Sequence, residues 1–237
     1  MSLLNTTSGV SGQNKPAILC LHGSGTNSTI FNVQSIRIQR ALASHFSFVF
    51  IDGPYETGPG PGVVPFFEGC GPYFRWISFT GQLDMPERTR ELLSKTVEQQ
   101  RKKDGLGFVG VMGFSQGGRA AAGMLLEQQL KRGTGRKEGL RFGIFLNSMV
   151  PPMAYGLTEQ ELAEQIDCPS LHVIGVDDPW REGGQRLGLE HFDQGQSMIM
   201  EFNVGHRLPV LEEDTAMIVT EILRMYQETS VSQATVI

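Results

Sequence analysis

The sequence has few cysteines, and their arrangement suggests neither a structural cross-link nor a metal site. There are three of them, Cys20, Cys70 and Cys168. Their number is odd and no C-x-x-C pair occurs, so neither a disulfide framework nor a zinc site is indicated. We therefore expect no bound metal and a reducing, cytoplasmic setting.

The sequence also lacks an excess of positive charge and any long hydrophobic run. Its 25 Asp and Glu residues outnumber its 20 Lys and Arg residues, and without a broad basic surface we expect no nucleic-acid partner. No apolar run approaches the roughly 18–20 residues that cross a bilayer, so we expect no membrane partner. Residues 1–16 have neither a basic start nor an apolar stretch, and they do not indicate a secretory signal.

What the sequence does contain is an alternation of short apolar runs and amphipathic stretches. Most of the runs are almost wholly apolar, as is typical of strands that are buried on both faces. The predicted strands are 17–21, 46–51, 108–112, 142–147, 171–176 and 197–202. The predicted helices are 29–44, 86–103, 116–132, 158–165, 182–192 and 211–227. This order predicts an α/β fold with a mainly parallel sheet of about six strands and helices on both faces.

The chain has 237 residues, a length that suits one large α/β domain or two small ones. No internal repeat and no linker divides it, so we predict a single domain over residues 16–228. Residues 1–15 are rich in Ser, Thr, Asn and Gly, and we predict a flexible N-terminal segment there. Residues 229–237 are predicted to form a flexible C-terminal tail.

One long stretch, residues 53–81, interrupts the alternation because it is rich in Gly, Pro and aromatic residues. In a parallel α/β sheet it leaves the carboxyl end of the second predicted strand, where ligands bind. We expect it to wall a substrate pocket; the alternative is a packed cover over the sheet edge. The candidate pocket residues are Phe66, Phe67, Tyr73, Phe74 and Trp76.

The motif GFSQG, residues 113–117, follows the predicted strand 108–112 directly. A strand, then G-x-S-x-G, then a helix is the nucleophile elbow of α/β-hydrolases, in which a strained turn presents the serine at the top of the sheet. The flanking Gly113 and Gly117 leave room for the strand and the helix to approach each other. A tight turn without chemistry would also use small residues, but the context favours Ser115 as a nucleophile.

A serine hydroxyl needs a base, and His206 is the best placed of five histidines. It follows the last predicted strand in NVGHRLP, where this fold carries its base after the nucleophile and the acid. An ordinary polar loop residue is the alternative. The acid is expected between Ser115 and His206, just beyond a strand, and VIGVDDPW offers Asp177 and Asp178 there. We favour Asp178 from the Gly-x-x-Asp spacing and keep Asp177 as the alternative.

The negative charge that develops on the substrate oxygen needs two backbone N–H groups, which together form an oxyanion hole. One is expected from Gln116, directly after the nucleophile. The other is expected from the loop LHGSGTN after the first strand, and we choose Ser24. His22, in the same loop, is expected to shape it and not to act as the base.

With these residues in hand, the sequence resembles the fungal serine hydrolases of the FSH type. It is similar in particular to the small thioesterases of fungal polyketide gene clusters, such as the lovastatin-pathway releasing thioesterase. The matching stretches, of which the Gly- and Pro-rich loop is the most specific, are ILCLHGSGTNSTIFNVQ, FVFIDGP, GPGPGVVPFFEGCGPYFRW, GFSQGGRAAA, DDPWREGG and GHRLP. The resemblance implies an α/β-hydrolase fold, a Ser115–His206–Asp178 triad, and hydrolysis of an ester or thioester without a cofactor.

Three functions compete at this point. The first is a thioesterase that releases an acyl or polyketide chain from the acyl-carrier protein domain of a polyketide synthase. The second is a carboxylesterase that acts on a free small-molecule ester with the same triad. The third is a non-catalytic binding protein of the same fold, which would not need a strained serine. We expect the first, with a small-molecule acyl group as substrate.

Overall fold

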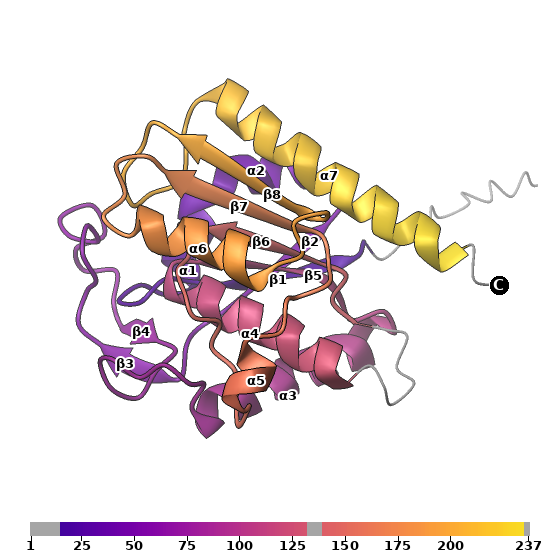
Figure 1. Ribbon diagram of the computed structural model, residues 1–237. Helices are drawn as coiled ribbons and strands as arrows, with labels where there is room; N and C mark the ends of the chain where they lie inside the picture. The colour runs from indigo at the N-terminus through magenta and orange to yellow at the C-terminus, as the bar shows by residue number, and fades with distance from the viewer. Residues whose placement is uncertain (1–14, 132–138, 235–237) are drawn as a thin grey trace, which may run out of the picture.

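A computed structural model describes residues 15–131 and 139–234 (Figure 1). Its centre is a six-stranded sheet with the strand order β2-β1-β5-β6-β7-β8, in which every neighbouring pair is parallel. The strands are β1 (Ala17–Leu21), β2 (Ser47–Ile51), β5 (Phe108–Phe114), β6 (Phe142–Leu146), β7 (Ser170–Gly175) and β8 (Ser197–Phe202). The six predicted strands and the predicted α/β fold are thereby confirmed.

Helices cover both faces of the sheet (Figure 1). One face packs against α3 (Glu87–Asp104), α4 (Gln116–Lys131) and α6 (Arg181–His191), with the short α5 (Glu159–Leu162) nearby. The other face packs against α1 (Ser28–Gln34), α2 (Ile36–Leu42) and α7 (Glu212–Ala234). Within the described ranges, no helix combines the length and the apolar character that crossing a bilayer takes.

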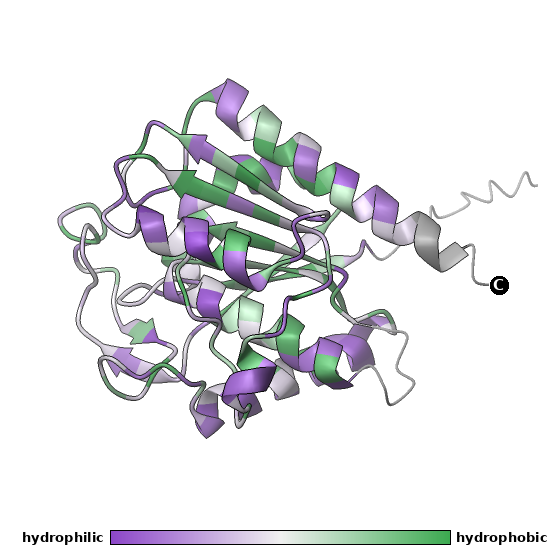
Figure 2. Cartoon of the chain, viewed as in Figure 1, coloured by the Kyte–Doolittle hydropathy of each residue, from purple (hydrophilic) through white to green (hydrophobic). Residues whose placement is uncertain are grey.

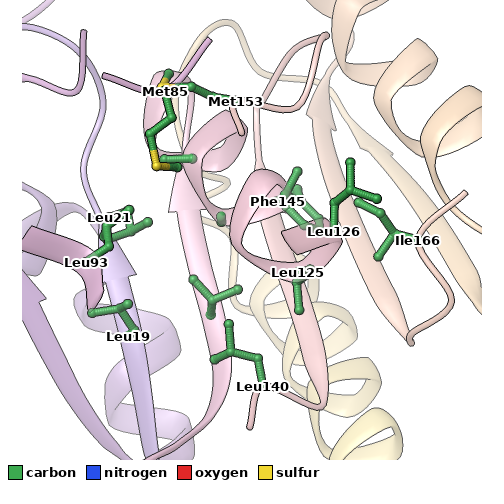
Figure 3. Close-up of a cluster of buried hydrophobic side chains, with 14 of the residues drawn as sticks. Leu19, Leu21, Met85, Leu93, Leu125, Leu126, Leu140, Phe145, Met153 and Ile166 are labelled. Atoms are coloured by element: carbon green, nitrogen blue, oxygen red, sulfur yellow. The ribbon is translucent and has the colours of Figure 1, made fainter. Parts of the chain in front are cut away.

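The two-sided cover explains why most of the strands are almost wholly apolar. On the α4 side, Leu19 and Leu21 of β1 and Phe145 of β6 belong to one buried cluster with Leu93 of α3 and Leu125 of α4 (Figure 3). Burying each such side chain contributes about 1.5–3 kcal/mol. In Figure 2 the strands are green over much of their length, while the helices alternate between green and purple, since only one side of each helix faces the sheet.

Three predicted helices have clearly different bounds in the structure, and one of them is α5, which covers only Glu159–Leu162 of the predicted range 158–165. The helix predicted over 29–44 is broken at Ser35, whose hydroxyl donates a hydrogen bond to the Phe31 carbonyl at 2.7 Å while its own backbone leaves helical geometry. The last helix extends past residue 228 to Ala234, so the tail predicted from 229 is helical over 229–234. The hydroxyls of Thr229 and Ser230 donate back to carbonyls four residues earlier, which a helix accommodates. Residues 1–14, predicted to be flexible, lie outside the described residues.

The long stretch 53–81 is irregular except for two short strands. β3 (Tyr55–Thr57) and β4 (Tyr73–Arg75) pair antiparallel as a separate small sheet. The end of the stretch is attached to the loop after β1, because Gly25 N–H donates to Phe74 O at 2.9 Å and Phe74 N–H donates to Thr26 O at 2.7 Å. The stretch therefore lies against the carboxyl end of the sheet, toward which the β7 and β8 arrows point in Figure 1.

Candidate active site

The turn between β5 and α4 holds Ser115 in a strained conformation. Its φ is 51°, a left-handed value that a residue with a side chain rarely adopts. Its N–H donates to Leu146 O at 2.9 Å, which ties the turn to the end of the neighbouring strand β6. Strain of this kind persists only where the surroundings impose it, and it marks functional positions.

The approach of α4 to the sheet requires glycine after this serine. A side chain on Gly117 would collide with the carbonyl groups of Leu21 and His22 at the end of β1. Gly23 is equally restricted, because a side chain there would meet the Phe114 ring and come within 3.5 Å of the Ser115 side chain. The loop after β1 therefore lies directly against the nucleophile turn.

The structure joins Asp178 and His206 directly. Nδ1 of His206 lies 2.7 Å from Oδ2 of Asp178, and the carboxylate side chain is only 1% exposed. The second oxygen of Asp178 accepts a hydrogen bond from the Trp180 N–H at 2.8 Å. Asp177, the alternative, is exposed, and its N–H pairs with Val204 O. Only Asp178 of the two contacts the imidazole.

Two aromatic side chains pack against the His206 ring. The ring centroid of Trp180 is 4.6 Å from that of His206, and that of Phe114 is 4.9 Å away. Because Phe114 immediately precedes Ser115, this packing places the imidazole beside the nucleophile turn. The three side chains predicted as a triad thus come from three strand ends that meet at one edge of the sheet.

The two N–H groups predicted for the oxyanion hole flank the same turn. Gln116 is the first residue of α4, where a backbone N–H has no partner within the helix. Ser24 follows Gly23 in the loop that lies against Ser115. In the part of the chain that the structure describes, neither N–H donates to another backbone carbonyl. Both are therefore available to a bound group.

His22 forms hydrogen bonds within the protein through both ring nitrogens, so neither nitrogen is free for acid–base catalysis. Its Nε2 accepts from Gly53 N–H at 2.9 Å, and its Nδ1 donates to Gly23 O at 2.7 Å. Burial lowers the pKa of His22 to about 4, so the ring stays neutral near pH 7. The ring links the loops that follow β1 and β2.

The position of Trp76 differs from the predicted one in the pocket wall. Its side chain is fully buried in the core against the sheet, so it does not line an open pocket wall. Its indole N–H donates to His22 O at 2.7 Å, and its backbone N–H donates to the side-chain oxygen of Gln116 at 2.7 Å. Trp76 therefore braces the two segments that carry the predicted oxyanion donors. The sequence could not reveal this, because burial in an irregular segment follows no period.

The other four predicted pocket residues lie nearer the surface. Phe66 is 86% exposed, and Phe67, Tyr73 and Phe74 are half-buried. A cavity of about 430 Å³ lies at this edge, and of the five predicted residues only Phe74 lines it. Its lining residues are Asn27, Ser28, Thr29, Asp52, Cys70, Gly71, Pro72 and Phe74.

Comparison with known proteins identifies the family of the chain. The profile of the family described as Serine hydrolase (FSH1) matches residues 10–218. The chain belongs to this family. It is an enzyme of the serine hydrolase class, and the resemblance seen in the sequence is confirmed.

Relatives of this FSH1-family hydrolase include fungal esterases and a thioesterase. Thioesterase FSL2 of Gibberella zeae is 34% identical over 232 residues, covering 88% of this chain and 91% of its own. Esterase FUS5 of Gibberella moniliformis is 37% identical over 220 residues, covering 90% of this chain and 88% of its own. Both cover nearly the whole chain, so the similarity is not limited to one motif.

Solved structures show the fold of the FSH1-family hydrolase. Esterase PE8 matches with a TM-score of 0.62 at 20% identity, covering 91% of this chain and 95% of its own. The carboxylesterase of Mesorhizobium loti matches with a TM-score of 0.56 at 16% identity, covering 88% of each chain. At these identities the likeness concerns the α/β-hydrolase fold alone.

Proposed function

We propose that this hydrolase releases an acyl chain from an acyl-carrier protein thioester through a Ser115–His206–Asp178 triad. The observation that carries the proposal is the 2.7 Å hydrogen bond between His206 and the buried Asp178 carboxylate, with the imidazole packed on the residue before the strained Ser115. A serine in such a turn, beside an oriented imidazole, has the arrangement that nucleophilic acyl transfer requires.

The reaction proceeds in two steps. In the first, Ser115 Oγ attacks the thioester carbonyl carbon while Nε2 of His206 takes the hydroxyl proton. The carbon–sulfur bond then breaks, and the departing thiol receives that proton, which leaves an acyl-enzyme. In the second step His206 removes a proton from water, the resulting hydroxide attacks the acyl carbon, and Ser115 departs with its proton restored.

Asp178 and the oxyanion hole serve these steps electrostatically. The Asp178 carboxylate accepts from Nδ1 of His206, which leaves Nε2 free for the serine and stabilises the imidazolium. The N–H groups of Gln116 and Ser24 receive the negative oxygen of each tetrahedral intermediate. Preorganised donors of this kind stabilise charge that exists only near the transition state.

The thioester substrate is supported by the similarity to Thioesterase FSL2, and an exposed arginine supports a carrier-bound form. Arg207 follows the base directly, and in the described part of the chain no carboxylate pairs with it. Arg181, by contrast, has its charge matched by Glu201 at 2.9 Å. Arg207 is therefore available to the phosphate of a phosphopantetheine arm. The similarity to Esterase FUS5 favours the second candidate, hydrolysis of a free ester.

A panel of substrates with one shared acyl group separates these candidates. We expect kcat/KM for the carrier-bound thioester to exceed that for the matched small-thiol thioester and oxygen ester by about tenfold or more, the effect of one charge-assisted contact. Mass spectrometry of the released acid measures each rate. Arg207→Gln should lower the rate on the carrier substrate only, with Arg181→Gln as the matched control. Equal rates on carrier-bound and free substrates would favour the esterase instead.

Phe66 offers a test of the acyl-binding role of the long stretch. Gly60 N–H donates to Gly25 O at 3.0 Å, so the segment that carries Phe66 begins against the predicted oxyanion loop. Because the ring is 86% exposed, Phe66→Ala should leave Tm nearly unchanged. Lost contact with a long acyl chain should cost about 1–3 kcal/mol in kcat/KM and nothing for an acetyl group.

The measurement is kcat/KM across a ladder of acyl lengths, beside Tm for each variant. Leu106→Ala is the matched control, since Leu106 is 55% exposed and precedes β5 at the opposite edge of the sheet. If Phe66→Ala loses the same factor for acetyl and long-chain substrates, the segment is a cover and the acyl chain lies elsewhere.

A further inference from the structure

The residue that follows β6, Asn147, shares the unusual backbone of the nucleophile. Ser115 and Asn147 are the non-glycine residues with positive φ in the described part of the chain, at 51° and 44°. Asn147 is only 2% exposed. A buried residue held in a rare conformation needs a reason, and its hydrogen bonds supply one.

Both the oxygen and the nitrogen of the Asn147 side-chain amide form hydrogen bonds. Its Oδ1 accepts from Gly175 N–H at 2.7 Å, at the end of β7. Its Nδ2 donates to Arg207 O at 2.9 Å, in the loop after β8. Asp178 lies three residues after the first contact, and His206 lies directly before the second. One buried amide thus joins the segment that carries the acid to the segment that carries the base.

The backbone around Asn147 extends these connections to the nucleophile. Its own N–H donates to Val173 O at 2.8 Å, while the preceding Leu146 O accepts from Ser115 N–H at 2.9 Å. The hydroxyl of the following Ser148 donates to Ser115 O at 3.3 Å. Residues 146–148 therefore contact the segments of all three proposed triad members.

We propose that Asn147 is a positioning residue that holds the His206 loop in register with Asp178 and Ser115. The inference rests on the proposed triad. Few other hydrogen bonds join the loop after β8 to the segment that carries the acid. One of them runs from Asp177 N–H to Val204 O at 3.1 Å. Releasing Arg207 O from Asn147 lets the imidazole shift relative to Ser115, and small misplacements of a catalytic group reduce turnover strongly.

The chemistry of the position explains why asparagine stands there. The Gly175 N–H needs an acceptor and the Arg207 carbonyl needs a donor, and one amide side chain supplies both. Asparagine also tolerates the left-handed backbone better than most residues with side chains. Aspartate would keep the acceptor and lose the donor, while glycine would keep the backbone and lose both.

These differences define the test. Asn147→Gly keeps a residue that accepts φ of 44°, so the chain should fold, and Asn147→Asp retains the Gly175 contact. Both should lower kcat by about 10- to 100-fold on the best thioester with little change in KM. The far-downfield proton resonance of the Asp178–His206 hydrogen bond should shift or disappear. Asn203→Gly, an exposed change in the same loop, is the matched control and should do neither.

The kcat values of the Asn147 variants are compared with their Tm values and with the kcat of the Ser115→Ala variant. A loss of kcat that only follows the folded fraction, with the downfield resonance unchanged, would mean that Asn147 is merely structural and would overturn the proposal. The Ser115→Ala variant distinguishes failure of the proposed triad from failure of the positioning role. If that variant stays active, the triad itself is wrong; if it is inactive while Asn147→Gly turns over normally, only the positioning role fails.

Discussion

Ser115→Ala should lower kcat by several orders of magnitude and leave the fold intact. The hydroxyl is the proposed attacking group, and triad members act as a unit, so loss of the nucleophile in a serine hydrolase can cost about 10⁶-fold. Alanine keeps a Cβ and loses only the oxygen, so the strained turn at φ 51° should persist. Turnover of the best thioester and Tm measure the two effects.

Ser94→Ala is the control, since Ser94 is an exposed residue of α3. It should retain full turnover and full labelling by a fluorophosphonate probe, whereas Ser115→Ala should lose both. Retention of a tenth or more of the parent kcat by Ser115→Ala would contradict the assignment. It would also revive a binding function for the chain.

Asp178→Asn should lower kcat by about 10⁴-fold, as expected when an amide replaces the acid of such a triad. An amide can donate to Nδ1 of His206, which then presents a hydrogen on Nε2 and cannot take the serine proton. The volume is nearly unchanged, so Tm should fall little. The measurement is kcat on the best substrate beside Tm.

Asp177→Asn is the matched control, because it makes the same chemical change at the adjacent residue. Asp177 is exposed and does not contact His206, so its variant should keep turnover near that of the parent. The reverse order of effects would move the acid role to Asp177. Equal and small losses in both variants would remove the acid from the mechanism.

Much of the fold could be predicted because local patterns of apolar residues indicate its strands and helices. Apolar runs such as 108–112 and 171–176 mark strands covered on both faces, and the stretches between them have helical spacing. The bounds of the helices were harder to predict from the sequence. Ser35 breaks a helix through its own side chain, and Thr229 and Ser230 continue one because their hydroxyls bond back to the helix.

Much of the candidate site could be predicted as well, for a topological reason. Parallel strands end at one edge of the sheet, so residues just beyond β5, β7 and β8 must gather there. That rule places Ser115, the adjacent pair Asp177 and Asp178, and His206 at one edge. The roles of these residues stay predictions until the variants are measured.

The sequence by itself thus determined the α/β-hydrolase fold, the family and the edge of the sheet where the candidate site lies, because the succession of strands and helices along the chain and the spacing of the motifs are local properties. Only the tertiary structure decided which of Asp177 and Asp178 meets His206, since one residue of turn geometry separates a buried carboxylate from an exposed one. It alone moved Trp76 from a pocket wall into the core and revealed the hydrogen bonds of Asn147. These contacts join segments far apart in the chain, and no period or spacing in the sequence encodes them.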